Sequence, residues 1–275
     1  MNTIKKFWAA IVYIVGLSLA LQPALALPAK HTENLNLPQA EEGAEVIYLG
    51  KKTDPKTKLE VDGIMFIHKK NNAKNGSARK PGGTTCYSYL GAGAKWKGTP
   101  ESWLMNTANT RGLDGNTVFN LMSNGIAKWE DAADGNVGNS LGVNILGDGS
   151  TTSSVLTADS AAPDGVNEVY FADISGGSTI GVTTVWGIFG GPTFNRQLVE
   201  WDMVLDDVTF DWSTSGDLAK MDFDSIATHE LGHAVGMGHP SNSCTEETMF
   251  AYGTEGETKK RDLNTWDIQG INNLY

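Results

Sequence analysis

This sequence has few of the features that define several common protein classes. It contains only two cysteines and only five histidines, and after residue 21 it has no apolar stretch that could cross a membrane. No cysteine lies near residue 26, where a lipid anchor would need one. Positive charge is scarce in residues 81–275, which hold nine Lys and Arg against twenty-five Asp and Glu. That acidic balance argues against nucleic acid or anionic lipid as a partner.

The one long apolar stretch lies at the N-terminal end. Lys5 and Lys6 precede an apolar run over residues 7–21, and Ala24-Leu25-Ala26 has the small-x-small pattern of a signal-peptidase site. We therefore predict a signal peptide over residues 1–26 and a secreted, extracellular protein that has no membrane association after cleavage. An uncleaved membrane anchor is the alternative.

A basic segment precedes the acidic part of the chain. Residues 27–80 hold ten Lys and Arg against seven Asp and Glu. Residues 44–49 and 61–68 are rich in apolar and β-branched side chains, which predicts a β-hairpin. Residues 69–83 are rich in Lys, Asn, Gly and Ser, which predicts an exposed linker. An inhibitory pro-region held partly by its charge fits this pattern, and so does a small permanent N-terminal segment.

Three of the five histidines lie in one stretch, from His229 to Pro240, that reads His-Glu-Leu-Gly-His-Ala-Val-Gly-Met-Gly-His-Pro. His229 and His233 are four residues apart, so on a helix both imidazoles project from one face and can bind one metal ion. Gly236 can adopt the left-handed conformation that ends a helix, which would bring His239 round as a third ligand. Three neutral imidazoles predict a zinc ion with one open coordination position, as in catalytic sites.

Glu230 lies beside the predicted ligands without having to be one. Zinc lowers the pKa of a bound water towards about 7 and polarises a carbonyl group. Glu230 would take the proton from that water and later hand it to the leaving amine. The stretch therefore predicts hydrolysis of peptide bonds, with Glu230 as general base and then general acid.

The same five positions resemble the extended motif of the metzincin zinc endopeptidases. Residues 248–253, which include Met249, resemble the methionine turn of that group. Residues 222–228 and 260–271 resemble the matrixin branch, particularly its secreted prokaryotic members. Pro240 departs from the matrixin pattern, which usually has Ser or Thr after the third histidine.

The resemblance implies an α+β fold of the zincin type. It implies a twisted, mixed but mostly parallel β-sheet, an active-site helix and a small helical C-terminal subdomain. Residues 86–275 would form the catalytic domain, which leaves residues 27–85 as the pro-region or N-terminal segment. Met249 would form a hydrophobic floor beneath the metal without binding it. Since the chain stops at Tyr275, where a matrixin catalytic domain would end, we expect no further domain.

The resemblance also implies a strand that binds substrate. In matrixins an edge strand above the metal pairs with the backbone of the peptide, and residues 179–186 and 198–206 are two expected strands in the corresponding part of this chain. An ordinary buried strand is the alternative. The candidate residues for substrate pairing are Thr183, Thr184, Val185 and Trp186.

The two cysteines allow two arrangements. In a secreted chain they favour one disulfide, between Cys86 and Cys244. Matrixin zymogens instead use a pro-region cysteine to occupy the zinc, and Cys86 lies upstream of the catalytic core, where such a switch would be. Its setting, Thr-Cys-Tyr-Ser, lacks the Pro-Arg-Cys-Gly-x-Pro-Asp pattern of that device. We therefore favour the disulfide.

Additional metals have fewer candidate ligands. Many matrixins hold a structural zinc through further histidines, but the other two here, His31 and His68, lie in the N-terminal part. No second histidine-bound zinc is therefore expected in the catalytic domain. Calcium is allowed, because carboxylate oxygens are its preferred ligands. The candidate calcium ligands are Asp202, Asp206, Asp207 and Asp211, or alternatively the Asp-Gly turns.

Residue periodicity predicts the remaining elements. A helix should start at Asp114 or Asn116, Asp222 should cap the active-site helix, and a last helix should start near Asn264 with Asp267 in its cap. The other expected strands are residues 102–108, 153–159 and 168–174.

The sequence therefore predicts a secreted, monomeric zinc endopeptidase that cleaves extracellular proteins or peptides by attack of a zinc-bound water assisted by Glu230. The alternative is a secreted binding protein that keeps the fold and the zinc without proteolysis, although a base beside an open metal position argues against it. A purely structural zinc site would need a fourth ligand, for which Cys86 is the one candidate.

Overall fold

The chain is described here by a computed structural model, which covers residues 34–39, 43–71, 85–98, 100–139 and 141–275. The predicted signal peptide, residues 1–26, and most of the predicted linker lie outside these described residues. Within them, none of the helices combines the length and the apolar character that a membrane span requires.

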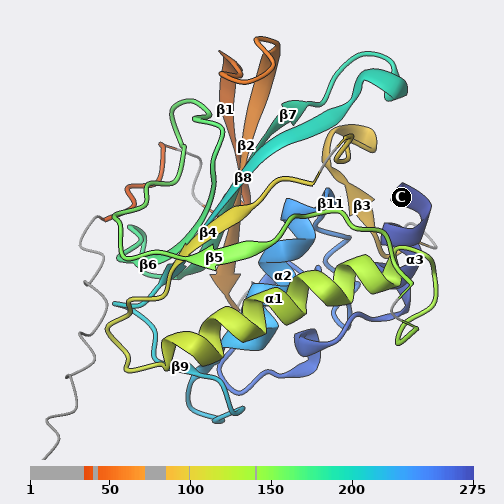
Figure 1. Cartoon of the computed structure of the whole chain (residues 1–275). Coiled ribbons are helices and arrows are strands. Elements are labelled where there is room, and N and C mark those ends of the chain that lie inside the picture. Colours follow the sequence, from red (N-terminus) through yellow and green to blue (C-terminus); the bar gives the residue numbers. More distant parts are fainter. Residues whose placement is uncertain (1–33, 40–42, 72–84, 99, 140) are drawn as a thin grey trace, which may run out of the picture.

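One eight-stranded sheet forms the centre of the molecule (Figure 1). Its strands follow the order β1-β2-β7-β8-β6-β4-β5, and β12 also pairs with β2. Strands β5, β4, β6 and β8 run parallel to one another, whereas β7, β2 and β1 continue the sheet by antiparallel pairing. The bounds are β1 (Val46–Thr53), β2 (Glu60–Lys70), β4 (Trp103–Asn106), β5 (Gly149–Thr151), β6 (Asn167–Ala172), β7 (Thr179–Ile188), β8 (Gln197–Asp206) and β12 (Tyr252–Gly253).

Short elements surround this sheet. Two small sheets pair β3 (Ser88–Tyr89) with β11 (Met237–Gly238) and β9 (Trp212–Ser213) with β10 (Met221–Asp222). The helices are α1 (Gly115–Ala132), α2 (Phe223–Ala234) and α3 (Thr265–Leu274), with short 3-10 turns η1 (Leu90–Ala92), η2 (Thr193–Asn195) and η3 (Lys259–Arg261).

Helices α1 and α2 lie side by side on one face of the sheet (Figure 1). Asp114 caps α1 by accepting the N–H of Thr117 at 2.8 Å, and Asp222 caps α2 by accepting the N–H of Ser225 at 3.0 Å. Asn264 and Asp267 form a capping box at the start of α3. The three predicted helix starts are therefore confirmed.

The predicted strand over residues 153–159 is wrong. This segment is irregular, and the shorter β5 takes the position beside β4. Side chains satisfy its backbone groups in place of a neighbouring strand, because Asn106 donates to the carbonyl of Ser154 at 2.9 Å and Asp202 accepts the N–H of Asp159 at 2.8 Å.

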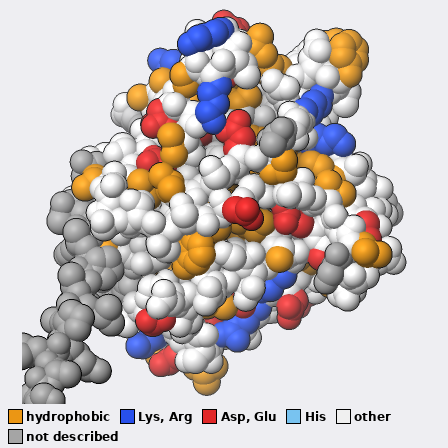
Figure 2. All heavy atoms as spheres, in the orientation of Figure 1, with side chains coloured by type: hydrophobic (Ala, Val, Ile, Leu, Met, Phe, Trp, Pro, Cys, Tyr) orange, Lys and Arg blue, Asp and Glu red, His pale blue; other side chains and the backbone are white. Residues whose placement is uncertain are grey.

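The predicted N-terminal hairpin is present as β1 and β2, but it is not a separate module. Since β2 pairs with β7 over residues 62–69, the hairpin extends the main sheet. Met65 and Ile67 join the apolar cluster on one face of the sheet, and Phe66 joins the larger cluster on the helix face. Lys and Arg side chains gather over the tip of the hairpin, whereas several Asp and Glu side chains lie across the middle of the same view (Figure 2).

This α+β fold consists of a mixed sheet with a buried parallel half, the helix α2 that carries the histidine motif, and the C-terminal helix α3. The predicted fold class is confirmed. What the sequence did not indicate is the position of the hairpin, which lies against the helix of the motif.

Candidate metal centre

Three histidine side chains converge on one point beside α2. Nε2 of His239 lies 3.0 Å from Nε2 of His233 and 3.2 Å from Nε2 of His229. Nitrogens that bind one tetrahedral zinc at 2.0–2.1 Å lie about 3.3 Å apart. The structure therefore brings the three predicted ligands together in an arrangement that fits one zinc ion.

Backbone carbonyls fix the ring orientation of two of these histidines. Nδ1 of His229 lies 2.6 Å from the carbonyl oxygen of Thr248, and Nδ1 of His233 lies 2.9 Å from that of Met237. Because a carbonyl only accepts, each Nδ1 carries the proton and each Nε2 presents its lone pair to a metal. Burial lowers the pKa of His233 to about 3 and lowers that of His229 well below its usual value. Both rings are therefore in the neutral form that binds zinc.

The backbone around the motif brings His239, the third predicted ligand, beside the other two histidines. Gly236 has a φ of 105°, and the chain then reverses through β11 to His239. A Cβ at position 236 would lie 2.7 Å from the carbonyl oxygen of Ala94, so both conformation and space require glycine. At the start of α2, Arg261 donates to the two carboxylate oxygens of Asp222 at 2.8 and 2.6 Å. This bidentate pair anchors the helix that carries the other two ligands.

Glu230 is fully buried beside the three histidines. Its Oε2 accepts a hydrogen bond from Oγ1 of Thr183 at 2.6 Å, and its Oε1 lies 3.1 Å from Nδ1 of His68. Burial raises the pKa of Glu230 to about 8. A carboxyl group with a raised pKa at a metal site is suited to taking up and releasing a proton.

His68 and Lys260 are buried at this site, and the sequence analysis assigned neither of them to it. Nζ of Lys260 donates to the backbone oxygens of Phe250 and Tyr252 and to Nε2 of His68, the last at 3.1 Å. Since Nε2 of His68 accepts, its Nδ1 carries the proton that it donates to Glu230. No spacing in the sequence connects these side chains, because β2 reaches the site only through tertiary pairing.

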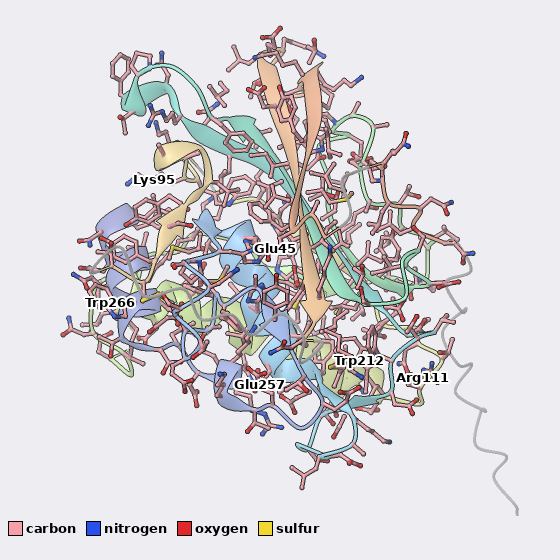
Figure 3. The ribbon with its side chains drawn as sticks, turned by 180° about the vertical axis from the view of Figure 1, so that it is seen from behind. Glu45, Lys95, Arg111, Trp212, Glu257 and Trp266 are labelled. Carbon is pink, nitrogen blue, oxygen red and sulfur yellow. A yellow bond between two sulfur atoms is a disulfide. The ribbon has the colours of Figure 1, made fainter. Side chains whose placement is uncertain are left out.

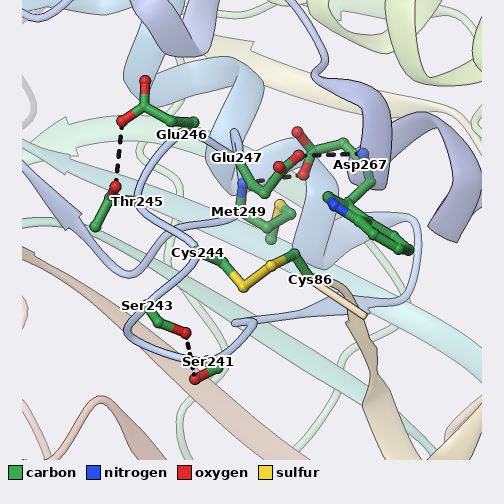
Figure 4. The surroundings of a disulfide bond; sticks show 10 residues. Cys86, Ser241, Ser243, Cys244, Thr245, Glu246, Glu247, Met249 and Asp267 are labelled. Atoms are coloured by element: carbon green, nitrogen blue, oxygen red, sulfur yellow. Dashed lines mark hydrogen bonds between the residues drawn. A yellow bond between two sulfur atoms is a disulfide. The ribbon is translucent and has the colours of Figure 1, made fainter. Parts of the chain in front are cut away.

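The loop that carries Met249 lies beneath the ligands. Met249 is fully buried against α2, where a Cβ at Gly232 would lie only 2.1 Å from its Sδ. Asp267 of α3 accepts the N–H of Met249 at 3.3 Å (Figure 4). It also accepts the N–H of Thr248 at 2.7 Å, and the two bonds fix this loop. The role of Met249 as a floor beneath the metal stays a prediction.

A disulfide joins Cys86 to Cys244, close to the same loop (Figure 4). The two residues are 158 apart in sequence, and their Cα atoms lie 5.6 Å apart. The favoured pairing is therefore present. Because its sulfur is bonded to Cys244, Cys86 serves neither as a cysteine switch nor as a fourth zinc ligand in this structure.

The strand expected to bind substrate is not at an edge of the sheet. In the described chain β7 lies between β8 and β2, and all its residues from Thr179 to Gly187 are buried. The expected free edge is taken by β2, so an incoming peptide could not pair there in this arrangement. Pairing with substrate stays a prediction for the residues concerned, which are Thr183, Thr184, Val185 and Trp186.

Strand β2 also covers the histidines. The Phe66 ring stacks on the His233 ring at 3.9 Å between centroids, and the His68 ring lies 3.9 Å from the His229 ring. The two covered ligands are 0% exposed, and the side chain of His239 is 8% exposed. In this conformation the metal centre is therefore closed to a peptide.

The acids predicted as calcium ligands have other partners. Asp202 and Asp206 accept backbone N–H groups, Asp207 accepts the N–H of Thr110, and Asp211 pairs with Arg111 at 2.9 Å. None of the four belongs to a metal-ligating group found among the described residues. The calcium prediction gains no support from these positions. A separate acidic group consists of Asp159, Asp164 and Glu200.

Comparisons with known proteins find relatives for the C-terminal part. The matrixin family model matches residues 185–275. Metalloendoproteinase 2-MMP of Arabidopsis thaliana is 40% identical over 76 residues, which are 25% of this chain and 19% of that protein. Matrilysin of Homo sapiens is 39% identical over 62 residues, 22% of each chain. Metalloendoproteinase 1 of Glycine max is 36% identical over 70 residues, 23% of this chain and 22% of that one.

This chain therefore spans about a fifth of the length of the curated relatives that it matches. The region matched by the family model contains β8, α2, the three histidines and the Met249 loop, whereas β1 and β2 lie outside it. The similarity covers the residues of the metal centre and leaves the hairpin that covers them unmatched.

Proposed function

We propose that this chain is a zinc-dependent endopeptidase of the matrixin-like metzincin type, because residues 185–275 match the matrixin family model and resemble matrixin relatives. The convergence of three neutral imidazoles beside Glu230 is the observation that carries the proposal. A metal held by three side chains keeps a coordination position for a reactant, whereas a structural zinc site uses four protein ligands.

The roles of the residues follow from their positions. His229, His233 and His239 would hold the zinc ion through Nε2. Zinc bound there would act as a Lewis acid that activates water and polarises the peptide carbonyl. Glu230 would take one proton from the attacking water and deliver it to the leaving nitrogen as the C–N bond breaks. Thr183 keeps the carboxylate in place through its bond to Oε2.

We also propose that the enzyme acts outside the cell, as a monomer, on extended segments of proteins or peptides. The apolar N-terminal run and the disulfide support secretion. The substrate backbone would pair with the edge of β7 that β2 occupies here. Met249 would be the floor of the centre. The pairing residues would be Thr183, Thr184, Val185 and Trp186.

Cleavage of an unstructured protein such as casein tests the proposal. The assay should use the folded, zinc-loaded chain after it has been cut between Asn71 and Thr85, so that the hairpin is no longer covalently attached. We expect hydrolysis that a zinc chelator stops and added zinc restores. Glu230→Ala and Glu230→Gln should keep zinc and fold but lose at least about a hundredfold in rate.

An active Glu230→Ala protein would refute this mechanism. If the cut, folded and zinc-loaded chain cleaves nothing, the site would instead belong to a zinc-containing binding protein, which is the other function that the sequence allows.

A further inference from the structure

We call residues 85–275 the body of the protein. Beside the candidate metal centre, the end of β2 lies between two strands of the body, β7 and β12. It pairs antiparallel with β7 over residues 62–69 and parallel with β12 at its last two residues. The N–H of Lys70 donates to the carbonyl of Ser178 at 2.8 Å, and that of Asn71 donates to Gly253 at 2.7 Å. Main-chain hydrogen bonds to a sheet edge give an added peptide strand its affinity.

The side chains of β2 complete the closure. Phe66 lies flat on a ligand ring, and His68 donates to Oε1 of Glu230. Because Thr183 already occupies Oε2, both oxygens of the proposed base have partners. Glu45, just before β1, lies where the hairpin crosses α2 (Figure 3). Its Oε2 is 3.9 Å from Nδ1 of His239.

The hairpin therefore meets the three requirements of an internal inhibitor. It fills the pairing edge of β7, it covers the metal ligands, and it binds the base through His68. A thiol plays no part in this closure, because Cys86 is bonded to Cys244.

On the basis of the function proposed above, we propose that the β1–β2 hairpin is an autoinhibitory segment that occupies the substrate position on β7, with His68 bonded to Glu230. The site opens only when the hairpin is released. A covalent connection to the body raises the effective concentration of the hairpin at the site, so an intact chain stays closed.

Two placements of one engineered cut test this inference. A recognition site for a sequence-specific protease is introduced between Asn71 and Thr85 in one full-length protein. In the control protein it replaces residues 55–58, the exposed turn of the hairpin. Both cuts nick the chain, but only the first frees β2 from the body. Circular dichroism and tryptophan fluorescence show whether each nicked protein is folded.

After dilution, we expect the protein cut next to Asn71 to hydrolyse a quenched peptide at least about tenfold faster than its uncut form. The protein cut in the turn should stay close to the uncut rate, because β2 remains attached. Equal activity of the uncut, turn-cut and linker-cut forms would overturn the inference and leave the proposed function intact.

A binding measurement keeps the inference testable without activity. The Glu230→Gln protein is cut next to Asn71, and its released hairpin is removed. A labelled synthetic peptide of residues 44–71 is then titrated in by fluorescence anisotropy. It should rebind, and a peptide with Phe66→Ala and His68→Ala should bind at least about tenfold more weakly. The matched control peptide carries Tyr48→Ala, which removes an exposed ring from the same hairpin.

The peptide should also slow chelator extraction of the zinc, because β2 covers the ligands. Failure of the wild-type peptide to rebind a folded body, or equal binding of all three peptides, would overturn the inference. If the peptide rebinds but the linker-cut protein with Glu230 intact hydrolyses nothing, the inference that the hairpin occupies the groove stands and the proposed protease function is refuted.

Discussion

The hairpin and residues 185–275, which match the family model, meet at the same candidate metal centre, but the sequence specifies them in different ways. Within residues 185–275, His229, Glu230 and His233 come from two adjacent turns of one helix, and a short reversal adds His239. The hairpin brings His68 to Glu230 across 162 residues of sequence. Local geometry thus places the candidate metal ligands, whereas long-range strand pairing covers them.

The two regions also differ in what holds them in place. Helix α2 packs within the main apolar cluster, and Arg261 anchors its cap. The hairpin lies beyond β7 in the sheet, where β2 pairs with β7 and buries Val61, Met65 and Phe66. Release of the hairpin would therefore expose this apolar surface.

The largest expected effect distinguishes two buried histidines, one from each region. His233→Ala should reduce bound zinc from one ion per chain to a small fraction, because two imidazoles remain. His68→Ala should leave one zinc per chain, since His68 contacts the base and is not one of the converging ligands. Metal analysis of the two purified, folded variants measures this. Loss of zinc in His68→Ala would make the hairpin part of the metal site.

The next largest effect concerns the disulfide, which lies within the body, residues 85–275, and does not involve the hairpin. Removing it with Cys86→Ser and Cys244→Ser should lower the free energy of unfolding by about 2–5 kcal/mol, because a long loop is no longer closed in the unfolded chain. Chemical denaturation in oxidising and reducing buffers measures the loss. The wild-type protein should approach the double variant on reduction. A stability unchanged by both treatments would show that the bond does not constrain the body.

A smaller effect comes from carboxyl groups buried in the body. Burial raises the pKa of Glu168 to about 7 and raises those of Glu200 and Asp202 above their usual values. A carboxyl whose pKa is higher in the folded chain than in the unfolded chain favours folding at low pH and costs stability as pH rises towards the folded pKa. These three groups should therefore lower stability from pH 5 to pH 8, by up to roughly 1 kcal/mol per pH unit for each, whereas the buried neutral histidines His229 and His233, whose pKa values are lowered, contribute with the opposite sign.

Denaturation curves at several pH values test this expectation. Glu200→Gln keeps the shape of the side chain and removes its charge, so the stability of the variant relative to the wild-type protein should increase from pH 5 to pH 8. A stability difference that is the same at every pH would contradict the assignment.

The smallest effect tests whether charge holds the hairpin to the body. Lys70 pairs with Glu255 of the body, and the two side chains are 36% and 29% exposed. An ion pair of this exposure contributes at most about 1 kcal/mol, so Lys70→Ala should weaken binding of the 44–71 peptide by no more than about fivefold. Lys51→Ala is the matched control, because Lys51 pairs with Glu60 inside the hairpin. A larger loss for Lys70→Ala would make charge the main attachment.

Much of the metal centre could be predicted because its geometry is local. The four-residue spacing of His229 and His233 holds on any α-helix, and Gly236 allows the reversal that delivers His239. The helix caps at Asp114 and Asp222 depend on nearest neighbours in the same way. Pairing of the two cysteines followed from their being the two in the chain.

Other parts of the fold could not be predicted from local patterns. The apolar pattern of residues 153–159 resembles a strand, but side chains from β4 and β8 satisfy its backbone groups. Lys260 is buried because two carbonyls and His68 receive its N–H groups, and all of these come from distant parts of the chain or from a loop conformation. Periodicity carries no information about such partners.

The sequence by itself determined which side chains can bind zinc and which carboxyl lies beside them, because one helical turn fixes those distances. Only the tertiary structure decided that β2 lies on the edge of β7 and that Phe66 and His68 close the centre. The residue pattern of a strand shows which of its faces is apolar, but which strand it pairs with depends on the free energy of the whole sheet. A short segment of this chain therefore determines the candidate metal ligands, whereas a contact between distant segments determines access to them.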